Sequence, residues 1–536
     1  MAGNRFLKVD ADNFPYVFLK NADIPLKTYE TGLLRCNVYL PKDAVPFGRK
    51  TYPVIATMVP VRAHHGKEVP YESFFKKSWD QLSPGMKSPH AAWETPDPGF
   101  WTSKGYIVVR ADERGAGQSP GELDTMSCGT SETFFDVVEW CAEQEWSSGK
   151  VGLLGISYYA GTQWRVAARK PKGLAAIIPW EGMSDYYSFW WNNCAQPNQY
   201  GMPGRAARKW GDDTLEGNLT EAELVRSRRD PMKDTAVHKF MDEEYYKSRT
   251  FDLGAIEVPL LSVANWGGIL LHLRGNIVEW MRASSQHKFL RFILQLSFLD
   301  SFLKDNDHDG WKSGQQPPVH ICLRKGDCGI DDPERELNFP SRPESDWPIP
   351  DTQYTKYFLT ADQTLSTTPG AERKMCTYDA MNGEPINFSF KTPTQLEITG
   401  RIIARLRVSC KEVFYTGTMG DPVPVVKGWL RVSLRKVEGH PFHRPYLPYR
   451  DYFQSDVQEV RKNEKYDVDV EVWPTNTVLE EGETLVLEIA GHDTQGLGKF
   501  SYEHPEDRSP EVFHGYNTVE VGGDASFLVL PVIPSR

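Results

Sequence analysis

VGLLGISYYAG, residues 151–161, joins a short apolar run to a Gly-x-Ser turn and continues into GTQWRVAARK (161–170). This order predicts a buried strand, a tight turn and a helix. In such a turn the serine hydroxyl stands above the sheet, beside the first N–H groups of the helix. We therefore predict that Ser157 is a catalytic nucleophile and that the backbone N–H of Tyr158 faces the oxyanion that forms in acyl transfer.

The residues around this serine fit such a turn only in part. Strand and helix approach closely there, so small residues are usually needed two positions before and after the serine. Gly155 meets the first requirement, whereas Tyr159 occupies the second position and Gly161 comes two residues later. Gly-x-Ser triplets also occur at purely structural turns, so the triplet by itself leaves a structural role open.

Other short apolar runs, bounded by turn residues, surround this segment, as expected for strands buried on both faces of a sheet. They are PVIATMVP (53–60), GYIVVRAD (105–112), GLAAIIPW (173–180) and VPLLSVANW (258–266). SETFFDVVEWCAEQ (131–144) has apolar residues at helical spacing, with Ser131 or Thr133 as the expected N-cap. Alternating strands and helices predict a parallel sheet with right-handed crossovers.

Changes in composition divide the chain into four segments. Residues 1–182 and 257–315 are the two parts of the predicted α/β core. Between them, residues 183–256 are rich in Trp, Tyr, Asn, Arg and Asp and contain helical patches, which predicts a helical cap over the sheet. Residues 316–536 alternate in short strand-like pieces with Gly, Pro and Asn turns, which is typical of a β-sandwich or jelly roll. These pieces are VHICLRKG, TKYFLT, INFSFKT, ITGRIIARLRVS, GWLRVSLRKV, YDVDVEVWP, ETLVLEIAGH, YNTVEVGG and SFLVLPVIP.

Size and charge limit the classes of partner. At 536 residues the chain exceeds the roughly 250–300 residues at which single cores stop growing, so two or three domains are expected. A net charge of −11 offers no basic field for phosphate backbones, which argues against nucleic acid as the main partner. No stretch approaches the ~18 consecutive apolar residues that a membrane helix needs, so no membrane partner is expected. The expected partner is a small-molecule substrate, and a homo-oligomer is left open.

The remaining bulk features concern compartment and cofactors. The first residues lack the basic start and apolar core of a secretory signal, which predicts a cytoplasmic protein. Eight cysteines are scattered along the chain, and the pair Cys322 and Cys328 fits neither a metal nor a redox motif, which favours reduced structural thiols. His64 and His65 have no carboxylate at ligand spacing. No cofactor and no metal are therefore expected.

A family resemblance adds to these predictions. The segment WSSGKVGLLGISYYAGTQW (146–164) resembles the elbow of the CocE/NonD hydrolases, the group that contains cocaine esterase and the X-Pro dipeptidyl peptidases. Their pattern is G-x-S-Y-x-G followed by T-Q-W, and Ala160 stands where the family has its second glycine. The matching residues are Gly155, Ser157, Tyr158, Thr162, Gln163 and Trp164.

The resemblance extends over the whole chain. RADERGAGQSPG (110–121) is similar to the family's D-x-R-G-x-G-x-S-x-G loop, PWEGMSD (179–185) to its cap entrance, and NTVEVGGDASFLVLPVIP (517–534) to its closing strands. It implies an α/β-hydrolase core with a helical cap and a C-terminal jelly roll, which agrees with the fold predicted from the residues.

The same resemblance predicts a catalytic acid and a histidine that this chain lacks. The family's aspartate follows a strand in a G-W-x-D motif, and its position falls on Gly268 in ANWGG. Its histidine follows the next strand, which corresponds to KFLRFI (288–293), but here Ile293 leads directly into the helical pattern LQLSFLDSFLK (294–304). Either the loop is lost from the protein or it was trimmed from the gene model as an intron, and sequencing the transcript across codons 290–297 distinguishes the two.

Substitutes for these residues can be named from their positions. His272 follows the strand that normally precedes the acid, so it is the candidate base, although a lone histidine is more often structural. Glu279 and Asp300 are the carboxylates in range. His65 precedes Gly66 and Lys67, where the family has a tyrosine as second oxyanion donor, and it is the candidate for that role against the alternative of a surface loop.

Two further motifs are weaker. GAGQSPG (115–121) lacks the spacing of a phosphate-binding loop, so phosphate binding is not expected there. The aromatic run DYYSFWWNN (185–193) fits either the lining of an acyl or aryl pocket or the core of the cap.

Three functions follow from these observations. The first is a serine hydrolase, an esterase or acyl hydrolase that cleaves a small-molecule ester or amide through an acyl-enzyme on Ser157. The alternative is a triad-deficient protein of the same fold that binds a metabolite or promotes a cyclisation or condensation step in a biosynthetic pathway of secondary metabolism. A binding-only protein that uses its jelly roll is the third, and fold alone does not support it.

Overall fold

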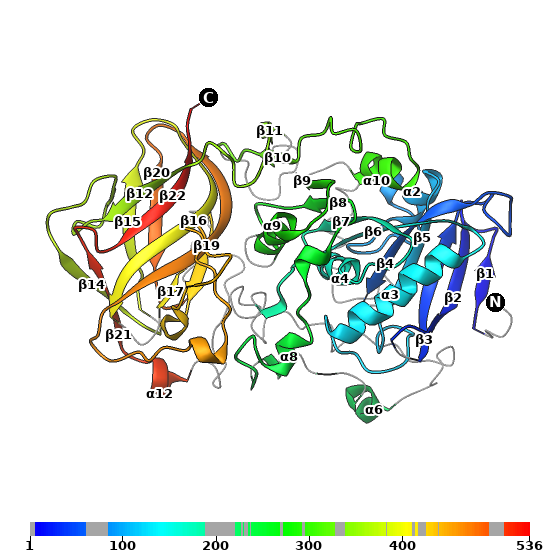
Figure 1. The fold of residues 1–536 in the computed structure, drawn as a ribbon, viewed down its shortest axis with the longest axis horizontal. Helices are drawn as coiled ribbons and strands as arrows, with labels where there is room; N and C mark the ends of the chain where they lie inside the picture. Colours follow the sequence, from blue (N-terminus) through cyan, green and yellow to red (C-terminus); the bar gives the residue numbers. More distant parts are fainter. Residues whose placement is uncertain are drawn as a thin grey trace.

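The two domains of the computed structural model lie side by side, a helix-covered sheet and a β domain (Figure 1). The residues that the structure describes are 6–29, 31–59, 84–187, 220–226, 229, 234–235, 237–268, 272–291, 295–326, 338–381, 383–409, 413–415, 425–437, 439–492 and 509–535.

The larger domain is built on a mixed sheet whose centre is parallel. Within the described residues eleven strands pair in the order β1-β2-β3-β5-β4-β6-β7-β8-β9-β10-β11. Neighbours from β5 to β10 run parallel, whereas β1 to β3 and β11 add antiparallel strands at the two edges. The strands are β1 (Lys8–Asp10), β2 (Val17–Leu26), β3 (Gly32–Leu40), β4 (Tyr52–Val59), β5 (Ile107–Asp112), β6 (Ser147–Ile156), β7 (Leu174–Trp180), β8 (Leu260–Val263), β9 (Lys288–Arg291), β10 (Val319–Cys322) and β11 (Ser341–Glu344). The apolar runs on either side of the elbow are therefore strands of a parallel sheet, as predicted.

Alternating side chains bury both faces of this sheet. On β4, Val54 and Ala56 enter the core under one layer of helices, whereas Ile55 enters the core on the opposite face. Helices α3, α4 and α9 contribute to the first core, and α2 and α10 to the second. The helices are α2 (Pro98–Ser103), α3 (Cys128–Glu143), α4 (Tyr158–Ala167), α9 (Leu273–Arg282) and α10 (Gln295–Leu303). The period of two along each strand thus produces a three-layer domain.

Helix α3 begins earlier than the sequence pattern indicates. Its N-cap is Ser127, whose side chain accepts a hydrogen bond from the N–H of Thr130 at 3.4 Å. Ser131 and Thr133 lie inside the helix, where their hydroxyls donate to carbonyls three or four residues back. The predicted cap was therefore wrong, because the polar residues before the first apolar position belong to the first helical turn.

The cap is described in part. Its helical pieces are α6 (Glu221–Arg226), α8 (Glu244–Lys247) and the 3₁₀ turn η2 (Leu253–Ala255), and a further turn, η1 (Pro84–Met86), precedes α2. Of the aromatic run 185–193, Tyr186 and Tyr187 are buried in a cluster with Tyr245 of α8 and Tyr452 of the β domain. For these two residues the structure supports the cap-core interpretation, and residues 188–193 lie outside the described part.

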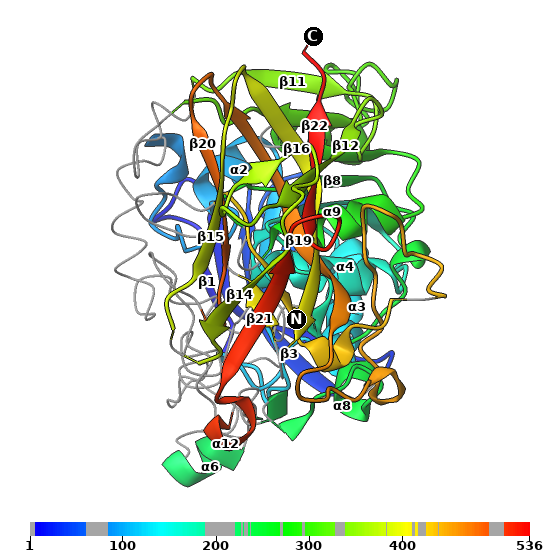
Figure 2. The same cartoon turned by 90° about the vertical axis from the view of Figure 1, so that its left-hand side faces the viewer.

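The β domain is a sandwich of antiparallel strands. Its larger sheet has the order β13-β12-β22-β16-β19-β18-β17, with β14 and β21 paired beside it, and β15 pairs with β20 in a second sheet. Side chains of both sheets share one apolar core. The strands are β12 (Gln353–Leu359), β13 (Leu365–Ser366), β14 (Lys374–Asp379), β15 (Ile386–Lys391), β16 (Leu396–Ser409), β17 (Val413–Tyr415), β18 (Gly428–Leu430), β19 (Tyr466–Leu479), β20 (Thr484–Ile489), β21 (Tyr516–Val521) and β22 (Phe527–Ile533), and the short helices are η3 (Val432–Leu434), η4 (Gln454–Asp456) and α12 (Pro510–Phe513). Figure 2 shows β16, β19, β21 and β22 in front of the sheet domain.

Two predicted strands of the β domain differ in the structure. VHICLRKG forms β10, but β10 pairs in parallel with β9 and therefore belongs to the large sheet. That sheet continues to Glu344, beyond the boundary expected at residue 315. GWLRVSLRKV is a strand only to Leu430 and then turns into η3. The local alternation of apolar and polar residues predicts a strand, but it does not determine which sheet the strand joins.

A buried ionic cluster fastens the β domain to helix α9. Arg274 of α9 forms two hydrogen bonds with the carboxylate of Glu471 on β19, at 3.0 and 3.1 Å. Arg401 on β16 donates to the same carboxylate at 2.7 Å, and all three residues are buried. Burial alone would raise the pKa of Glu471, but the two guanidinium groups hold it below its usual value. Glu471 is therefore shared by two buried cations at the domain interface, and Asp185, 3.7 Å from Arg274, supplies a second carboxylate.

Glu471→Gln tests this cluster, because it removes the carboxylate that pairs with Arg401 and leaves Arg274 only Asp185, 3.7 Å away. We expect the free energy of unfolding to fall by about 3–5 kcal/mol, measured by thermal and denaturant unfolding. Asp467→Asn, on the same strand, breaks an exposed pair with Arg407 and should cost less than about 1 kcal/mol. Equal losses in the two variants would contradict a special role for the interface cluster.

Candidate active site

Ser157 occupies a strained turn between β6 and α4. Its φ of 62° and ψ of −117° are values that residues other than glycine rarely adopt, and such strain costs about 1–3 kcal/mol. Hydrogen bonds hold the turn: the N–H of Ser157 donates to the carbonyl of Trp180 at 3.0 Å, and its own carbonyl accepts from Ala160 and Gly161. The side chain is half-buried, and among the described residues none hydrogen-bonds its hydroxyl. This is the conformation predicted for the elbow.

Gly155 permits the close approach of strand and helix. A Cβ atom at this position would lie 2.5 Å from Cβ of Tyr159 and 3.2 Å from Oγ1 of Thr57. Tyr159, which replaces the expected small residue, is therefore accommodated because Gly155 leaves space for the first carbon of its side chain.

Tyr158 is the first residue of α4 and is anchored through its ring. Its hydroxyl donates to Glu113 at 2.7 Å and accepts from the N–H of Met126 at 3.1 Å. Burial raises the pKa of Glu113 to about 7, and a hydrogen bond from Thr130 completes its surroundings. The backbone N–H of Tyr158 has no partner within the helix, because the first N–H groups of a helix never do. It is thus available to an acceptor near Ser157.

The carboxyl ends of β6, β7 and β8 form one edge of the sheet around this turn. Ile156, Trp180 and Val263 are paired across the three strands, so the residues that follow them are neighbours along the edge. Adjacent strands are about 4.8 Å apart. Ser157, Glu181 and Asn265 at this edge are half-buried or exposed.

Glu181 occupies the space beside Gly268, where the family's aspartate would lie. Its Oε1 accepts a hydrogen bond from the side chain of Asn265 at 3.0 Å. A Cβ atom on Gly268 would be 3.2 Å from its Oε2. The sequence does contain a carboxylate for this site, but one strand earlier than expected, and its position at the end of GLAAIIPW was the signal that could have identified it.

Glu94 is a second carboxyl group at the same edge. Its carbonyl accepts the N–H of Ile156, the residue before Ser157, at 3.1 Å, and its φ of 61° turns the chain there. Burial and repulsion from Glu181 raise its pKa to about 8, although the Trp93 indole donates a hydrogen bond to it. Sequence reasoning missed Glu94, because the segment around it has no strand or helix pattern.

His272, the candidate base, is buried at the start of α9. Its backbone N–H donates to the carbonyl of Gly268 at 3.1 Å, and burial lowers the pKa of its imidazole ring to about 3. No described contact joins its ring to Ser157. His65, the candidate oxyanion donor, lies outside the described residues, as do residues 269–271 and 292–294.

Glu279 and Asp300, the two carboxylates considered as possible acids for the site, lie away from Ser157. Glu279 is fully buried in α9, and among the described residues no group hydrogen-bonds its carboxyl. Asp300 of α10 accepts a hydrogen bond from Tyr106 at 2.7 Å and pairs with Lys304, in the helix layer opposite α9. Neither contacts Ser157.

The glycine-rich loop after β5 folds back on Asp112, the last residue of that strand. Asp112 accepts the N–H of Gln118 at 2.9 Å and its carbonyl accepts the hydroxyl of Ser119 at 2.7 Å. Gly117 lies so close that a Cβ atom there would be 2.2 Å from the Asp112 carboxylate. The loop is therefore a structural turn closed by an acidic side chain, which is unsuited to an anion.

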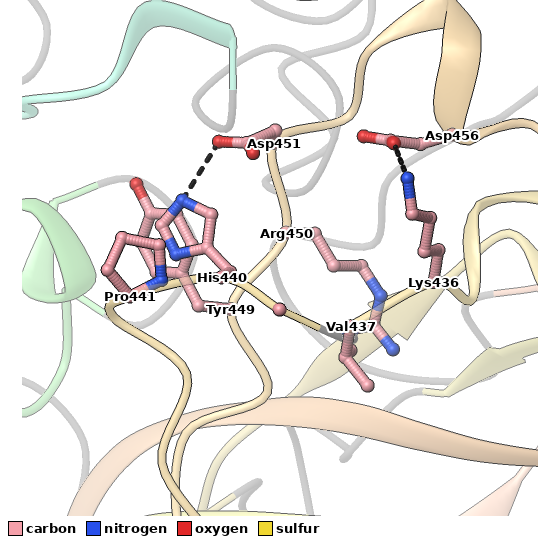
Figure 3. Close-up of a pocket in the computed structure, with 9 residues that line it drawn as sticks. Lys436, Val437, His440, Pro441, Tyr449, Arg450, Asp451 and Asp456 are labelled. Atoms are coloured by element: carbon pink, nitrogen blue, oxygen red, sulfur yellow. Dashed lines mark hydrogen bonds and ion pairs between the residues drawn. The ribbon is translucent and has the colours of Figure 1, made fainter.

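A cavity of about 200 Å³ lies in the β domain, among the loops after β18 (Figure 3). His440 pairs with Asp451 at 3.0 Å and stacks on Tyr449, while Lys436 pairs with Asp456 at 2.6 Å. These charged groups already satisfy one another, and none comes from the edge that carries Ser157.

Three further observations bear on the predicted absences. In the described part, no three His, Cys, Asp or Glu side chains are arranged to hold a metal ion. None of its helices is long and apolar enough to cross a bilayer. Five cysteines of the described ranges are free thiols, namely Cys36, Cys128, Cys141, Cys322 and Cys376.

Comparisons with known proteins cover both domains. Residues 31–296 match the X-Pro dipeptidyl-peptidase (S15) family, and residues 310–529 match the X-Pro dipeptidyl-peptidase C-terminal non-catalytic domain. Cocaine esterase of Rhodococcus sp. (strain MB1 Bresler) is 35% identical over 102 residues, which are 19% of this chain and 18% of that protein. A putative Xaa-Pro dipeptidyl-peptidase of Bacillus anthracis is 28% identical over 194 residues, 32% of this chain and 29% of that protein. These alignments thus span less than a third of either relative.

Solved structures resemble the chain over almost its whole length. A CocE/NonD family hydrolase from Staphylococcus aureus has a TM-score of 0.80 at 24% identity, covering 97% of this chain and 94% of that one. An aminopeptidase from a marine sediment Thaumarchaeota archaeon has a TM-score of 0.64 at 13% identity, covering 98% of both. At such identities the likeness establishes the fold alone.

Gly155→Ala tests the constraint at the turn. Because the added methyl group meets Tyr159, we expect the free energy of unfolding to fall by about 1–3 kcal/mol, and the accessibility of Ser157 to change with it. Gly85→Ala is the matched control, since a Cβ atom there meets nothing within 4 Å. In a Tyr159→Gly background the cost of Gly155→Ala should shrink, and additive losses in denaturant unfolding would contradict the proposed contact.

Proposed function

We propose that this chain, which belongs to the CocE/NonD, X-Pro dipeptidyl-peptidase-like family of α/β-hydrolases, is a serine hydrolase. Its substrate would be a small-molecule ester or amide, cleaved through an acyl-enzyme on Ser157. The observation that carries this proposal is the conformation of Ser157, a strained residue between a buried strand and a helix at an accessible edge of the sheet. Strain of this kind persists only where the surrounding structure maintains it, and it clusters at active sites.

The proposed reaction begins with the groups at this turn. The hydroxyl oxygen of Ser157 attacks the acyl carbon, and the carbonyl electrons move to the oxygen, where the N–H of Tyr158 stabilises the negative charge. His65 is proposed as the second donor. The leaving alcohol or amine departs with a proton, and water then hydrolyses the acyl-serine.

The base is the open part of this mechanism. His272 is neutral, because burial lowers its pKa to about 3, so its ring nitrogen is free of the extra proton. A conjugate acid of such low pKa offers little driving force for taking a proton from serine. His272 therefore stays the histidine candidate, but a weak base for this step.

A second function is favoured by one observation, the glycine at position 268. Without the family's aspartate the chain could bind a metabolite, or promote a cyclisation or condensation, without hydrolysis. The two functions differ in whether Ser157 is chemically activated.

A fluorophosphonate probe distinguishes them. We expect covalent labelling of the folded protein, reduced at least 100-fold in Ser157→Ala, because only an activated serine reacts with such a probe. Ser103→Ala, which removes an exposed hydroxyl on α2, should label like the unmodified chain. Absence of labelling in a protein with a cooperative thermal transition would contradict the hydrolase and favour the non-hydrolytic alternative.

A further inference from the structure

We propose that the carboxyl pair formed by Glu94 and Glu181 performs the acid–base work at Ser157. Glu94 is the group that takes the serine proton, and Glu181 is a positioning residue that acts through Glu94. This inference rests on the proposed function and names its missing base.

The backbone contacts place Glu94 beside the nucleophile. Its carbonyl bonds to the N–H of Ile156, and its carboxyl group interacts with that of Glu181. Ser157 lies between these two anchors along the edge: it follows Ile156 in the chain, and its N–H bonds to Trp180, the residue before Glu181. Glu94 and Glu181 therefore lie at the two backbone positions, Ile156 and Trp180, that flank Ser157 at this edge.

Glu181 is held in a fixed orientation next to this group. Its N–H donates to the carbonyl of Val263 at 2.8 Å, and Asn265 donates to its carboxylate at 3.0 Å. An aspartate at position 268 would crowd this carboxylate, because a Cβ atom there lies 3.2 Å from it. The glycine at position 268 thus leaves room for the carboxylate of Glu181.

The surroundings favour a shared proton. Two half-buried carboxyl groups near each other cannot both be ionised without mutual repulsion, so one of them keeps a proton to higher pH. Burial raises the pKa of both groups, and repulsion from Glu181 brings that of Glu94 to about 8. The described polar groups on the pair are Trp93 and Asn265, and His272 at the start of α9 is neutral. A group of this pKa matches the requirements of a general base near neutral pH.

The proton and electron movements balance with these groups alone. The Ser157 oxygen forms a bond to the acyl carbon while its proton passes to the Glu94 carboxylate. The tetrahedral intermediate then collapses, the bond to the leaving group breaks, and the leaving alkoxide or amine takes the proton from Glu94. In the second half, water adds to the acyl carbon and gives a proton to Glu94, which returns it to the Ser157 oxygen as the acyl–oxygen bond breaks.

The pH dependence of probe labelling tests this assignment. The base must be ionised, so the labelling rate of the unmodified chain should rise with pH through a midpoint near 8 and then level off. Glu181→Gln removes the repelling charge, which lowers the pKa of Glu94 and should shift the midpoint to lower pH. Glu94→Gln removes the base and should lower the rate about 100-fold or more.

Controls separate this inference from the function on which it rests. Glu143→Gln, at an exposed position of α3, should leave rate and midpoint unchanged, and Glu94→Asp should retain part of the rate because it keeps a carboxylate. Thermal melts report folding, and Glu181→Gln still tests the pair if Glu94→Gln does not fold. The carboxyl pair would be overturned if Glu94→Gln left the labelling rate unchanged and Glu181→Gln left the midpoint unchanged. If that labelling were still lost in Ser157→Ala, the serine hydrolase itself would stand. Loss of labelling in His272→Asn combined with full labelling in Glu94→Gln would assign the base to His272 instead.

Discussion

The rest of the site depends on how closely β6 and α4 approach each other at their turn. No side-chain atom beyond hydrogen fits at position 155, because the first carbon of Tyr159 occupies that space. The strand therefore passes into the helix at a single residue, Ser157, whose φ is positive. The hydrogen bond from Ser157 to Trp180 ties this strained residue to the next strand. The position and the backbone conformation of Ser157 thus depend on this packing contact and on the hydrogen bond to Trp180.

Helix α9 extends this constraint to the neighbouring strand ends and to the second domain. Asn276 accepts the N–H of Gly182 at 2.8 Å and donates to the carbonyl of Pro179 at 3.0 Å, so it fixes the chain on both sides of Glu181. Two residues earlier on the same helix, Arg274 forms the buried ion pair with the β domain. The β domain thus supports the helix that holds the sheet edge in place.

The carboxylate of Glu181 shows how the ends of two neighbouring strands can place an acidic group in the same part of the sheet edge. A carboxylate at the end of β8 and one at the end of β7 can occupy the same volume, because the two strand ends are neighbours in the parallel sheet. Gly268 leaves the first position empty, and Glu181 fills the volume from the second. The consequence is a like-charged pair with Glu94, which a triad with a single buried acid would not contain.

The sequence by itself determined the elements of the core and the location of the candidate nucleophile. Buried parallel strands are short and apolar on both faces, so the runs from 53–60 to 173–180 were recognisable without the fold, and the Gly-x-Ser turn identified Ser157. It did not reveal β2 and β3, whose residues alternate less regularly, nor the attachment of β10 to the large sheet. Only the tertiary structure brought Glu94 and Glu181 to the serine, because a side chain's neighbours across strands depend on which strand ends lie together, and no local pattern records that distance.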